Sequence, residues 1–233
     1  DMTDRTGTLY GVGVGPGDPG LVTFRAAEVG EKCEVLAIPA KEKEQAVSYG
    51  IMKELLPEIA DKICICLATP MTQDRKKLDA SYDRAAEKMA GFLAEGKSVA
   101  YLTLGDPTIY ATYIYVQRRI QKQGYPTEII SGVPAFCSVS AALGESLADH
   151  AEQIHIIPSV YGAEEALELS GTKVLMKCGS GLAEIKEMLS EHGKEAELIE
   201  NCGMKEQHIY RNIQEMPDKA GYYSTLIIRD RDV

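Results

Sequence analysis

The first apolar run of the chain leads into the stretch Tyr10-Gly11-Val12-Gly13-Val14-Gly15-Pro16-Gly17-Asp18-Pro19-Gly20. We predict that residues 8–14 form a strand, that the glycines and prolines form a turn, and that a helix begins near Leu21. A glycine-rich turn between a strand and a helix is where α/β proteins receive a ligand, because backbone can approach the ligand closely there. The stretch therefore predicts an α/β fold with a site at the carboxyl end of its first strand.

Short β-branched runs alternate with longer helix-compatible runs along the rest of the chain. We predict strands at 8–14, 34–38, 62–67, 98–103, 128–130, 153–157, 173–176, 197–199, 207–213 and 222–228. Helices are predicted where apolar residues recur three and four positions apart, at 21–31, 45–56, 78–95, 109–123, 135–143 and 182–192. Strands separated by helices are typical of α/β proteins with parallel sheets.

A domain boundary is predicted at Gln123-Gly124-Tyr125-Pro126, because a glycine that ends a helix is followed there by a proline. The predicted strands are too many for one small sheet. We therefore predict an N-terminal α/β domain at 6–124 and a C-terminal α/β domain at 125–233, with an interdomain cleft. The last strands of the second domain follow one another with only turns between them, which favours a mixed sheet.

Composition and charge exclude several classes of function. Of the 233 residues 45% are hydrophobic and 26% are charged, which is typical of a globular protein. The net charge of −10 argues against nucleic acid or an acidic membrane as partner. The six cysteines and four histidines show no metal-ligand spacing, so we expect reduced thiols and no protein-bound metal. No stretch approaches the roughly 18 apolar residues of a membrane helix and no signal region opens the chain, so a cytoplasmic protein is expected.

Small-residue turns follow several other predicted strands. Gly105-Asp106-Pro107 repeats the Gly-Asp-Pro of the first loop, and Ser131-Gly132-Val133-Pro134-Ala135 follows a later strand. Glycines at the carboxyl edge of a sheet let backbone reach a ligand. For Asp106, an N-cap that accepts from the first free N–H groups of a helix is an equally good interpretation.

The spacing of Gly15, Gly17 and Gly20 also matches the G-x-G-x-x-G pattern of a dinucleotide-binding loop, but two features argue against such a loop. Pro16 and Pro19 remove backbone N–H groups that a pyrophosphate needs. After Ile38 the sequence has no carboxylate to bind a ribose. A nicotinamide-dependent oxidoreductase is therefore kept only as an alternative.

The motifs Gly11-Val12-Gly13-Val14-Gly15-Pro16-Gly17-Asp18-Pro19, Leu104-Gly105-Asp106-Pro107 and Ser131-Gly132-Val133-Pro134 resemble, in this order and spacing, those of the tetrapyrrole methylases. Members of that family are S-adenosylmethionine-dependent methyltransferases with two α/β domains, a cofactor in the cleft between them and usually a homodimeric assembly. The resemblance covers essentially the whole chain. It implies a small-molecule tetrapyrrole as substrate and a homodimeric assembly.

Three stretches are most similar to the precorrin-2 and cobalt-precorrin-2 C20-methyltransferases of cobalamin synthesis: Gly7 to Gly13, Pro70-Met71-Thr72-Gln73-Asp74, and Leu102 to Thr112. The second stretch resembles an insertion of that group and is the most discriminating. Ala111 departs from the serine usual in the third. The resemblance implies methylation of the C20 meso carbon, with the cobalt content of the substrate left open.

The resemblance also implies a set of S-adenosylmethionine contacts: Pro16, Leu104, Gly105, Asp106, Ile109, Tyr110, Ser131, Gly132, Val133, Ala135, Met176, Ser224 and Thr225. For Met176, plain core packing is an equally good interpretation. The proton of C20 needs a base, and the proposed base of the related uroporphyrinogen methylases corresponds to Asp18, which could instead be a helix N-cap.

Substrate contacts are predicted at Tyr10, Met71, Thr72, Arg75 and Tyr101. The tyrosines could stack on the macrocycle or pack in the core. Arg75 opens a cationic run that could bind substrate carboxylates, although a solvated charge run is the more common case.

Three further alternatives stay open. Inside the family they are methylation at another tetrapyrrole position, or an acceptor like those of the diphthine synthases and ribosomal RNA methylases. From another class, the chain could be a non-catalytic tetrapyrrole carrier.

Overall fold

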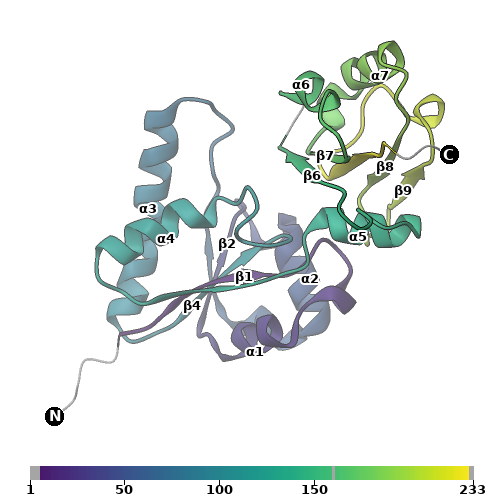
Figure 1. The fold of residues 1–233 in the computed structure, drawn as a ribbon. Helices are drawn as coiled ribbons and strands as arrows, with labels where there is room; N and C mark the ends of the chain where they lie inside the picture. The colour runs from purple at the N-terminus through teal and green to yellow at the C-terminus, as the bar shows by residue number, and fades with distance from the viewer. Residues whose placement is uncertain (1–5, 159–160, 231–233) are drawn as a thin grey trace. The chain divides into compact units, whose positions relative to one another are not determined.

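The computed structural model describes residues 6–158 and 161–230. The chain divides into two compact units, of which unit 1 spans residues 1–134 and unit 2 spans residues 135–233 (Figure 1). Each unit holds one five-stranded sheet, and the two-domain α/β class predicted from the sequence is confirmed. Among the described residues, every helix is too short or too polar to cross a bilayer.

Unit 1 is a parallel sheet with the strand order β3-β2-β4-β1-β5. Its strands are β1 (Leu9–Gly13), β2 (Val35–Ile38), β3 (Ile63–Cys66), β4 (Val99–Thr103) and β5 (Thr127–Ile130). Its α-helices are α1 (Phe24–Lys32), α2 (Val47–Leu55), α3 (Arg75–Ala94) and α4 (Tyr113–Lys122), and its short 3-10 helices are η1 (Pro19–Leu21), η2 (Lys43–Gln45) and η3 (Pro57–Asp61). Every residue of β2 and β4 is buried, as expected for parallel strands that are covered on both faces.

Side chains of β4 show how the helices cover the two faces. Tyr101 packs with residues of α3 and α4, whereas Ala100 and Leu102 pack with residues of α1 and α2. Because successive side chains of a strand point to opposite faces, α3 and α4 cover one face of the sheet and α1 and α2 the other. Figure 1 shows α3 and α4 side by side.

Unit 2 is a mixed sheet, as predicted, with the order β6-β7-β10-β8-β9. Only β6 and β7 pair in parallel, and the other neighbours are antiparallel. Its strands are β6 (Ile154–Ile157), β7 (Thr172–Met176), β8 (Ala196–Glu200), β9 (His208–Tyr210) and β10 (Ser224–Ile228). Its helices are α5 (Ala135–Leu143), α6 (Ala163–Leu167), α7 (Leu182–Glu191), η4 (Gly179–Gly181) and η5 (Ile213–Glu215).

Strand β5 changes the predicted domain division. The expected boundary at residues 123–126 would make β5 the first strand of the second domain, but β5 pairs with β1 over Leu9 to Val12. The compact units accordingly divide between Pro134 and Ala135. The glycine and proline signal marks the turn from α4 to β5 within unit 1.

Three helices of unit 1 begin three or more residues away from the predicted position. Helix α1 begins at Phe24 rather than at residue 21, because the Thr23 hydroxyl accepts from the Ala26 N–H and caps the helix. Helix α3 begins at Arg75 rather than at residue 78, because Asp74 accepts hydrogen bonds from the N–H groups of Lys76 and Lys77 and caps the helix. Helix α4 begins at Tyr113 rather than at residue 109, because the loop before it places Tyr110 in the left-handed region with φ 50°. The five-residue helix α6 was not predicted.

Candidate cofactor and substrate site

The carboxyl ends of β1 and β4 form the topological switch point of unit 1. The two strands are neighbours, but β1 leads into α1 on one face of the sheet and β4 leads into α4 on the other. Ligands of open α/β sheets bind outside strands whose connections diverge in this way, because the diverging loops leave a crevice. The first glycine loop and the Gly-Asp-Pro loop both begin at this edge.

The loops after β1, β4 and β5 approach one another at their glycines. Gly15 and Gly105 form an isolated antiparallel bridge, in which the Gly105 N–H donates to the Gly15 carbonyl at 2.7 Å. A Cβ on Gly132 would lie 2.1 Å from the Gly105 carbonyl oxygen, and a Cβ on Gly13 would lie 2.7 Å from the Gly132 nitrogen. Gly105 also has φ +69°, a conformation that side chains rarely adopt. The structure therefore brings Gly13, Gly105 and Gly132 together. A side chain on Gly13 or Gly132 would collide with backbone, and one on Gly105 is disfavoured by its positive φ.

Asp106 fixes this arrangement. Its Oδ1 accepts hydrogen bonds from the N–H and hydroxyl of Thr108, and its Oδ2 accepts from the Gly132 N–H at 2.9 Å. The side chain is 9% exposed. Asp106 is therefore not the predicted helix N-cap, because α4 begins only at Tyr113. Its Oδ1 closes a turn over Thr108, and its Oδ2 bonds to a loop 26 residues away. Its carboxylate ties the loops after β4 and β5 to each other.

Asp18 caps the short helix η1. Its Oδ1 accepts from the Gly20 N–H at 2.8 Å, and Pro19 occupies the first position of that helix. The side chain is exposed. Within the described residues the other carboxylate oxygen, Oδ2, has no hydrogen-bond partner. One oxygen of Asp18 is thus occupied by the cap and the other can accept a proton.

Other predicted cofactor contacts of unit 1 differ in their exposure. Pro16 is buried, Leu104 and Ile109 are half-buried, and Tyr110 is 46% exposed. In the turn after β5, Ser131 is exposed, whereas Val133 is half-buried. The last residue of this turn, Ala135, is the first residue of α5 and belongs to unit 2.

The predicted contacts of unit 2 lie next to one another in its sheet. Met176, the last residue of β7, is directly opposite Thr225 of β10 in the antiparallel pair. Ser224 is buried, and its hydroxyl donates to the Gly221 carbonyl at 2.7 Å. Met176 is half-buried, so one side of its thioether chain remains accessible. The structure therefore brings Met176, Ser224 and Thr225 together at one end of the β7–β10 pair.

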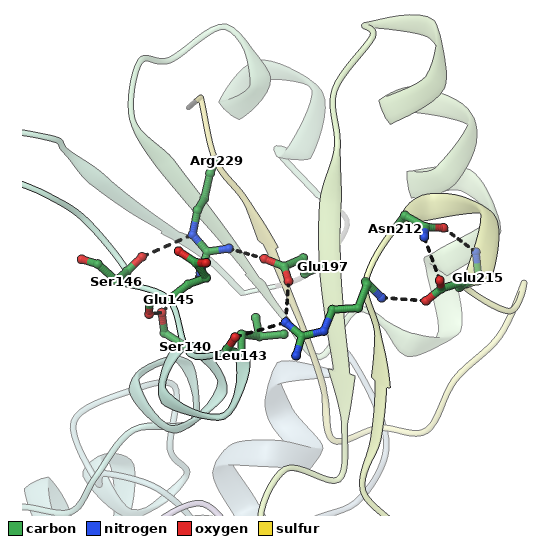
Figure 2. Close-up of polar contacts among 9 residues, drawn as sticks. Ser140, Leu143, Glu145, Ser146, Glu197, Asn212, Glu215 and Arg229 are labelled. Atoms are coloured by element: carbon green, nitrogen blue, oxygen red, sulfur yellow. Dashed lines mark hydrogen bonds and ion pairs between the residues drawn. The ribbon is translucent and has the colours of Figure 1, made fainter. Parts of the chain in front are cut away.

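Helix α5, which begins with the predicted contact Ala135, is held to the unit 2 sheet by an arginine network (Figure 2). Arg229, at the end of β10, donates to Glu197 of β8 at 2.5 Å, to the Ser140 hydroxyl and to the Ser146 carbonyl. Arg211 donates to the carbonyl of Leu143, the last residue of α5, and to Glu197. Cations at a helix C-terminus satisfy carbonyls that have no partner within the helix. This network fixes the position of α5 on its sheet.

The predicted substrate residues are not gathered in one place. Tyr10 packs against the cluster on the α1 and α2 face, whereas Tyr101 is buried on the α3 and α4 face. Met71 is 98% exposed in the loop before α3, where the hydroxyl oxygen of Thr72 accepts from the Asp74 N–H. Arg75 is an exposed residue in the first turn of α3. The structure thus separates the two tyrosines and leaves the loop residues open to solvent.

Thr103 is a residue at this site that the sequence analysis missed. It ends β4, directly before Leu104, and is 8% exposed. Its hydroxyl is buried and has no hydrogen-bond partner in the described part of the chain. A buried hydroxyl without a partner costs about 1–3 kcal/mol, so the atom is poised for a ligand or a water molecule. A polar residue at the end of an otherwise apolar strand, directly before Leu-Gly-Asp-Pro, was the available signal.

The chain is similar in sequence to enzymes that methylate tetrapyrroles. The sequence model of the Tetrapyrrole (Corrin/Porphyrin) Methylases matches residues 8–217. A probable cobalt-precorrin-2 C(20)-methyltransferase of Methanocaldococcus jannaschii is 33% identical over 170 residues, which cover 72% of this chain and 71% of that protein. A precorrin-2 C(20)-methyltransferase of a Sinorhizobium species is 30% identical over 235 residues, which cover 95% of each chain.

Solved structures share the fold at lower identity. A cobalt precorrin-4 methyltransferase superimposes with a TM-score of 0.74 at 16% identity, covering 95% of this chain and 94% of that one. A uroporphyrin-III C-methyltransferase of Thermus thermophilus, solved with S-adenosylhomocysteine bound, superimposes with a TM-score of 0.66 at 16% identity, covering 96% and 98%. These two likenesses concern the arrangement of the elements.

Proposed function

The chain belongs to the tetrapyrrole (corrin/porphyrin) methylase family, and from this premise we propose that it transfers a methyl group from S-adenosylmethionine to C20 of precorrin-2 or cobalt-precorrin-2 in cobalamin biosynthesis. The observation that carries the choice of substrate is the 30% identity, over 95% of both chains, to a precorrin-2 C(20)-methyltransferase. We also propose that it acts as a cytoplasmic homodimer, as the family resemblance implies, and light scattering after gel filtration tests the dimer.

The residues at the switch point fit S-adenosylmethionine. Gly13 and Gly132 let the loops after β1, β4 and β5 pack directly on one another, because a Cβ on either residue would meet backbone. A Cβ built on Gly105 would have no atom nearer than 3.9 Å, so an adenine or a methionine group can approach the backbone there. The Thr103 hydroxyl at the same strand end lacks a partner among the described residues and can bond a polar ligand atom. We propose that Pro16, Leu104 to Asp106, Ile109, Tyr110 and Ser131 to Val133 hold the cofactor from unit 1, and Ala135, Met176, Ser224 and Thr225 from unit 2.

When bound, S-adenosylmethionine would supply a methyl group on a positively charged sulfur. A bond from the electron-rich C20 to this methyl carbon would replace the methyl–sulfur bond, and neutral S-adenosylhomocysteine would leave. The protein then has two tasks, which are to hold the acceptor carbon in line with the methyl group and to remove the C20 proton. In favourable cases positioning alone contributes roughly 7–11 kcal/mol. The preformed bridge between Gly15 and Gly105 and the Asp106 bond to Gly132 serve this first task, because they fix the loops before a ligand binds.

For the second task we propose Asp18 as the base. Its Oδ2 carries no hydrogen bond from the described residues, whereas its Oδ1 holds the helix cap. Asp18→Asn separates the two roles, because asparagine caps a helix as well as aspartate but does not accept the proton. We expect unchanged thermal stability and S-adenosylhomocysteine affinity, with turnover reduced roughly 100- to 10,000-fold. Unchanged turnover would exclude Asp18 as the base.

The test of the function is anaerobic incubation with methyl-labelled S-adenosylmethionine and either cobalt-precorrin-2 or metal-free precorrin-2. Mass spectrometry and carbon NMR then locate the label. Label at C20 supports the proposal, and the preferred acceptor shows whether the substrate contains cobalt. Cofactor binding without methylation of either acceptor would point to another tetrapyrrole position or to another acceptor of the family. Binding of tetrapyrrole without S-adenosylmethionine affinity would favour a carrier, and binding of a nicotinamide cofactor an oxidoreductase.

A further inference from the structure

A small cavity lies on the α3 and α4 face of unit 1. It has a volume of about 100 Å³ and lies against the end of β3, the start of α4 and the middle of α3. Its lining includes the buried side chains of Tyr101 and Ser81 and the exposed cations Arg84 and Lys88. Sites for whole drug-sized ligands occupy about 300–1,000 Å³, whereas one water molecule takes about 30 Å³. The cavity is therefore the size of a small polar substituent.

The two cations at this cavity have no counter-ion among residues 6–158 and 161–230. Arg84 and Lys88 are four residues apart on α3, and neither forms an ion pair or a side-chain hydrogen bond in the described part of the chain. Arg119 of the neighbouring helix, by contrast, contacts both Asp79 and Asp83, at 3.0 and 2.6 Å. Like charges at this spacing destabilise a helix by a few tenths of a kcal/mol. In a protein with 35 acidic and 25 basic residues, an unpaired cationic pair at a cavity calls for an anionic ligand.

Tyr101 supplies a second polar group, independent of the cations. Its side chain is 2% exposed, and its hydroxyl has no hydrogen-bond partner in the described structure. Burial raises the pKa of Tyr101, so the hydroxyl stays protonated and acts as a donor. Because this O–H has no acceptor among the described residues, a ligand or water in the cavity can supply one. Two cations and one free O–H donor around a small cavity match the acceptor atoms of a carboxylate.

The cavity also adjoins both segments that the sequence links to the substrate. Leu67, Ala68 and Thr69 line it and directly precede Pro70, the first residue of the predicted insertion. Thr112 lines it from the other side and is the last residue of the stretch from Leu102 to Thr112. A group bound here is therefore next to two of the three stretches that resemble the C20-methyltransferases.

We propose that this cavity is a subsite for one carboxylate side chain of the tetrapyrrole, in which Arg84 and Lys88 provide the charge and Tyr101 donates a hydrogen bond. The proposal rests on the proposed function, because acetate and propionate side chains are what a tetrapyrrole would offer to a cavity of this size. It makes Arg84 and Lys88 specificity-determining residues and gives Tyr101 a role in hydrogen bonding instead of ring stacking.

Equilibrium binding of metal-free precorrin-2 in the absence of a methyl donor tests the subsite. Because the chain has no tryptophan, the tetrapyrrole's own absorbance is the signal. Arg84→Gln and Lys88→Gln should each weaken binding roughly 10-fold or more, the effect of losing a charge-assisted hydrogen bond. The control is Lys122→Gln, an exposed cation of α4 that does not line the cavity, which should leave affinity within roughly 2-fold. S-adenosylhomocysteine affinity should be the same in all of these proteins.

Tyr101→Phe removes only the hydroxyl and should weaken binding roughly 3- to 10-fold. The double variant with Arg84→Gln should lose less than the product of the two single losses, because both groups would hold the same carboxylate. Additive losses would mean that Tyr101 and Arg84 act at separate places and would overturn the shared subsite.

Two further ligands test whether the subsite binds a carboxylate of the substrate or any free anion. Propionate should compete with precorrin-2 for the wild-type protein but not for the Arg84→Gln variant. Precorrin-2 with its carboxylates esterified should bind wild type and Arg84→Gln equally. Unequal binding of the ester, or competition by propionate that survives the substitution, would overturn the proposal.

The outcomes for the subsite and for the function are distinguishable. If wild type methylates C20 but the Arg84 and Lys88 variants bind precorrin-2 as the Lys122 variant does, the subsite is refuted and the function stands. If the variants lose affinity but wild type methylates neither acceptor, the subsite stands and the function is refuted. If wild type does not bind precorrin-2, both are refuted.

Discussion

The close approach of Gly132 to the loop after β4 gives the sharpest test of the site's construction. A Cβ at this position would lie 2.1 Å from the Gly105 carbonyl oxygen, and ordinary contacts begin near 3.4 Å, so the loops would have to separate by about 1.3 Å. That separation also strains the bond from the Gly132 N–H to Asp106. Overpacking typically costs about 1–3 kcal/mol, and losing a hydrogen bond to a charged group about 1.5–3 kcal/mol. We therefore expect Gly132→Ala to destabilise the protein by about 2.5–6 kcal/mol.

The matched control is Gly50→Ala in α2, because no atom lies within 4 Å of a Cβ built on Gly50. Alanine in a helix interior is favoured over glycine, so this variant should gain about 0.5–1 kcal/mol. Thermal unfolding followed by circular dichroism should therefore show shifts of the melting temperature in opposite directions, with that of Gly132→Ala lowered by roughly 5–25 °C. Calorimetry should show S-adenosylhomocysteine binding weakened roughly 10- to 100-fold for Gly132→Ala, since a loop displaced by this distance misplaces its contacts. A melting temperature and an affinity equal to those of wild type would refute the reasoning.

Three other predictions concern stability and accessibility. Burial opposes ionisation of Asp230, but hydrogen bonds from Lys173 and neighbouring donors outweigh it and lower the pKa of Asp230. This stabilisation is present above the unfolded-state pKa and is lost as pH falls through the lower folded-state pKa. In urea titrations Asp230→Asn should therefore cost about 2–3 kcal/mol at pH 7, and this difference from wild type should begin to shrink only below about pH 4. Arg229→Met should cost about 2–4 kcal/mol and speed hydrogen exchange across α5, whereas unchanged exchange there would contradict the role of the arginine network. Iodoacetamide should label the exposed Cys137 in the native protein. It should label the buried Cys33 only after unfolding, because burial raises the pKa of that thiol to about 12. Peptide mass spectrometry of native and unfolded samples would detect both.

The sequence predicted where the strands and helices lie better than it predicted which strands pair with one another. Strands such as β4 were found because parallel strands covered on both faces are continuously apolar. The sheet to which β5 belongs was not visible, since a four-residue strand carries no information about its neighbour. The start of α4 was misplaced because the positive φ of Tyr110 depends on the loop that Asp106 ties down.

The sequence predicted which loops form the candidate site, but it did not predict the contacts between those loops. The glycine motifs located the carboxyl edge of unit 1, yet nothing in the sequence indicated that Asp106 would bond to Gly132, 26 residues later. Arg84 and Lys88 were overlooked because charges on a helix surface are usually solvated. Their distinguishing features, a cavity beside them and the lack of any acidic partner among the described residues, exist only in three dimensions.

The mutual contact of Gly13 and Gly132 has an evolutionary consequence. A Cβ on either residue would meet backbone atoms of the other at less than 3.0 Å. Most harmful substitutions in a core can be rescued by a second one that makes a neighbour smaller, but no residue is smaller than glycine. Neither position therefore has a compensating partner, and a lineage that loses one glycine must rebuild both loops before either can vary. We expect these two positions to be among the last to diverge in an alignment of related sequences, and to change together when they change at all.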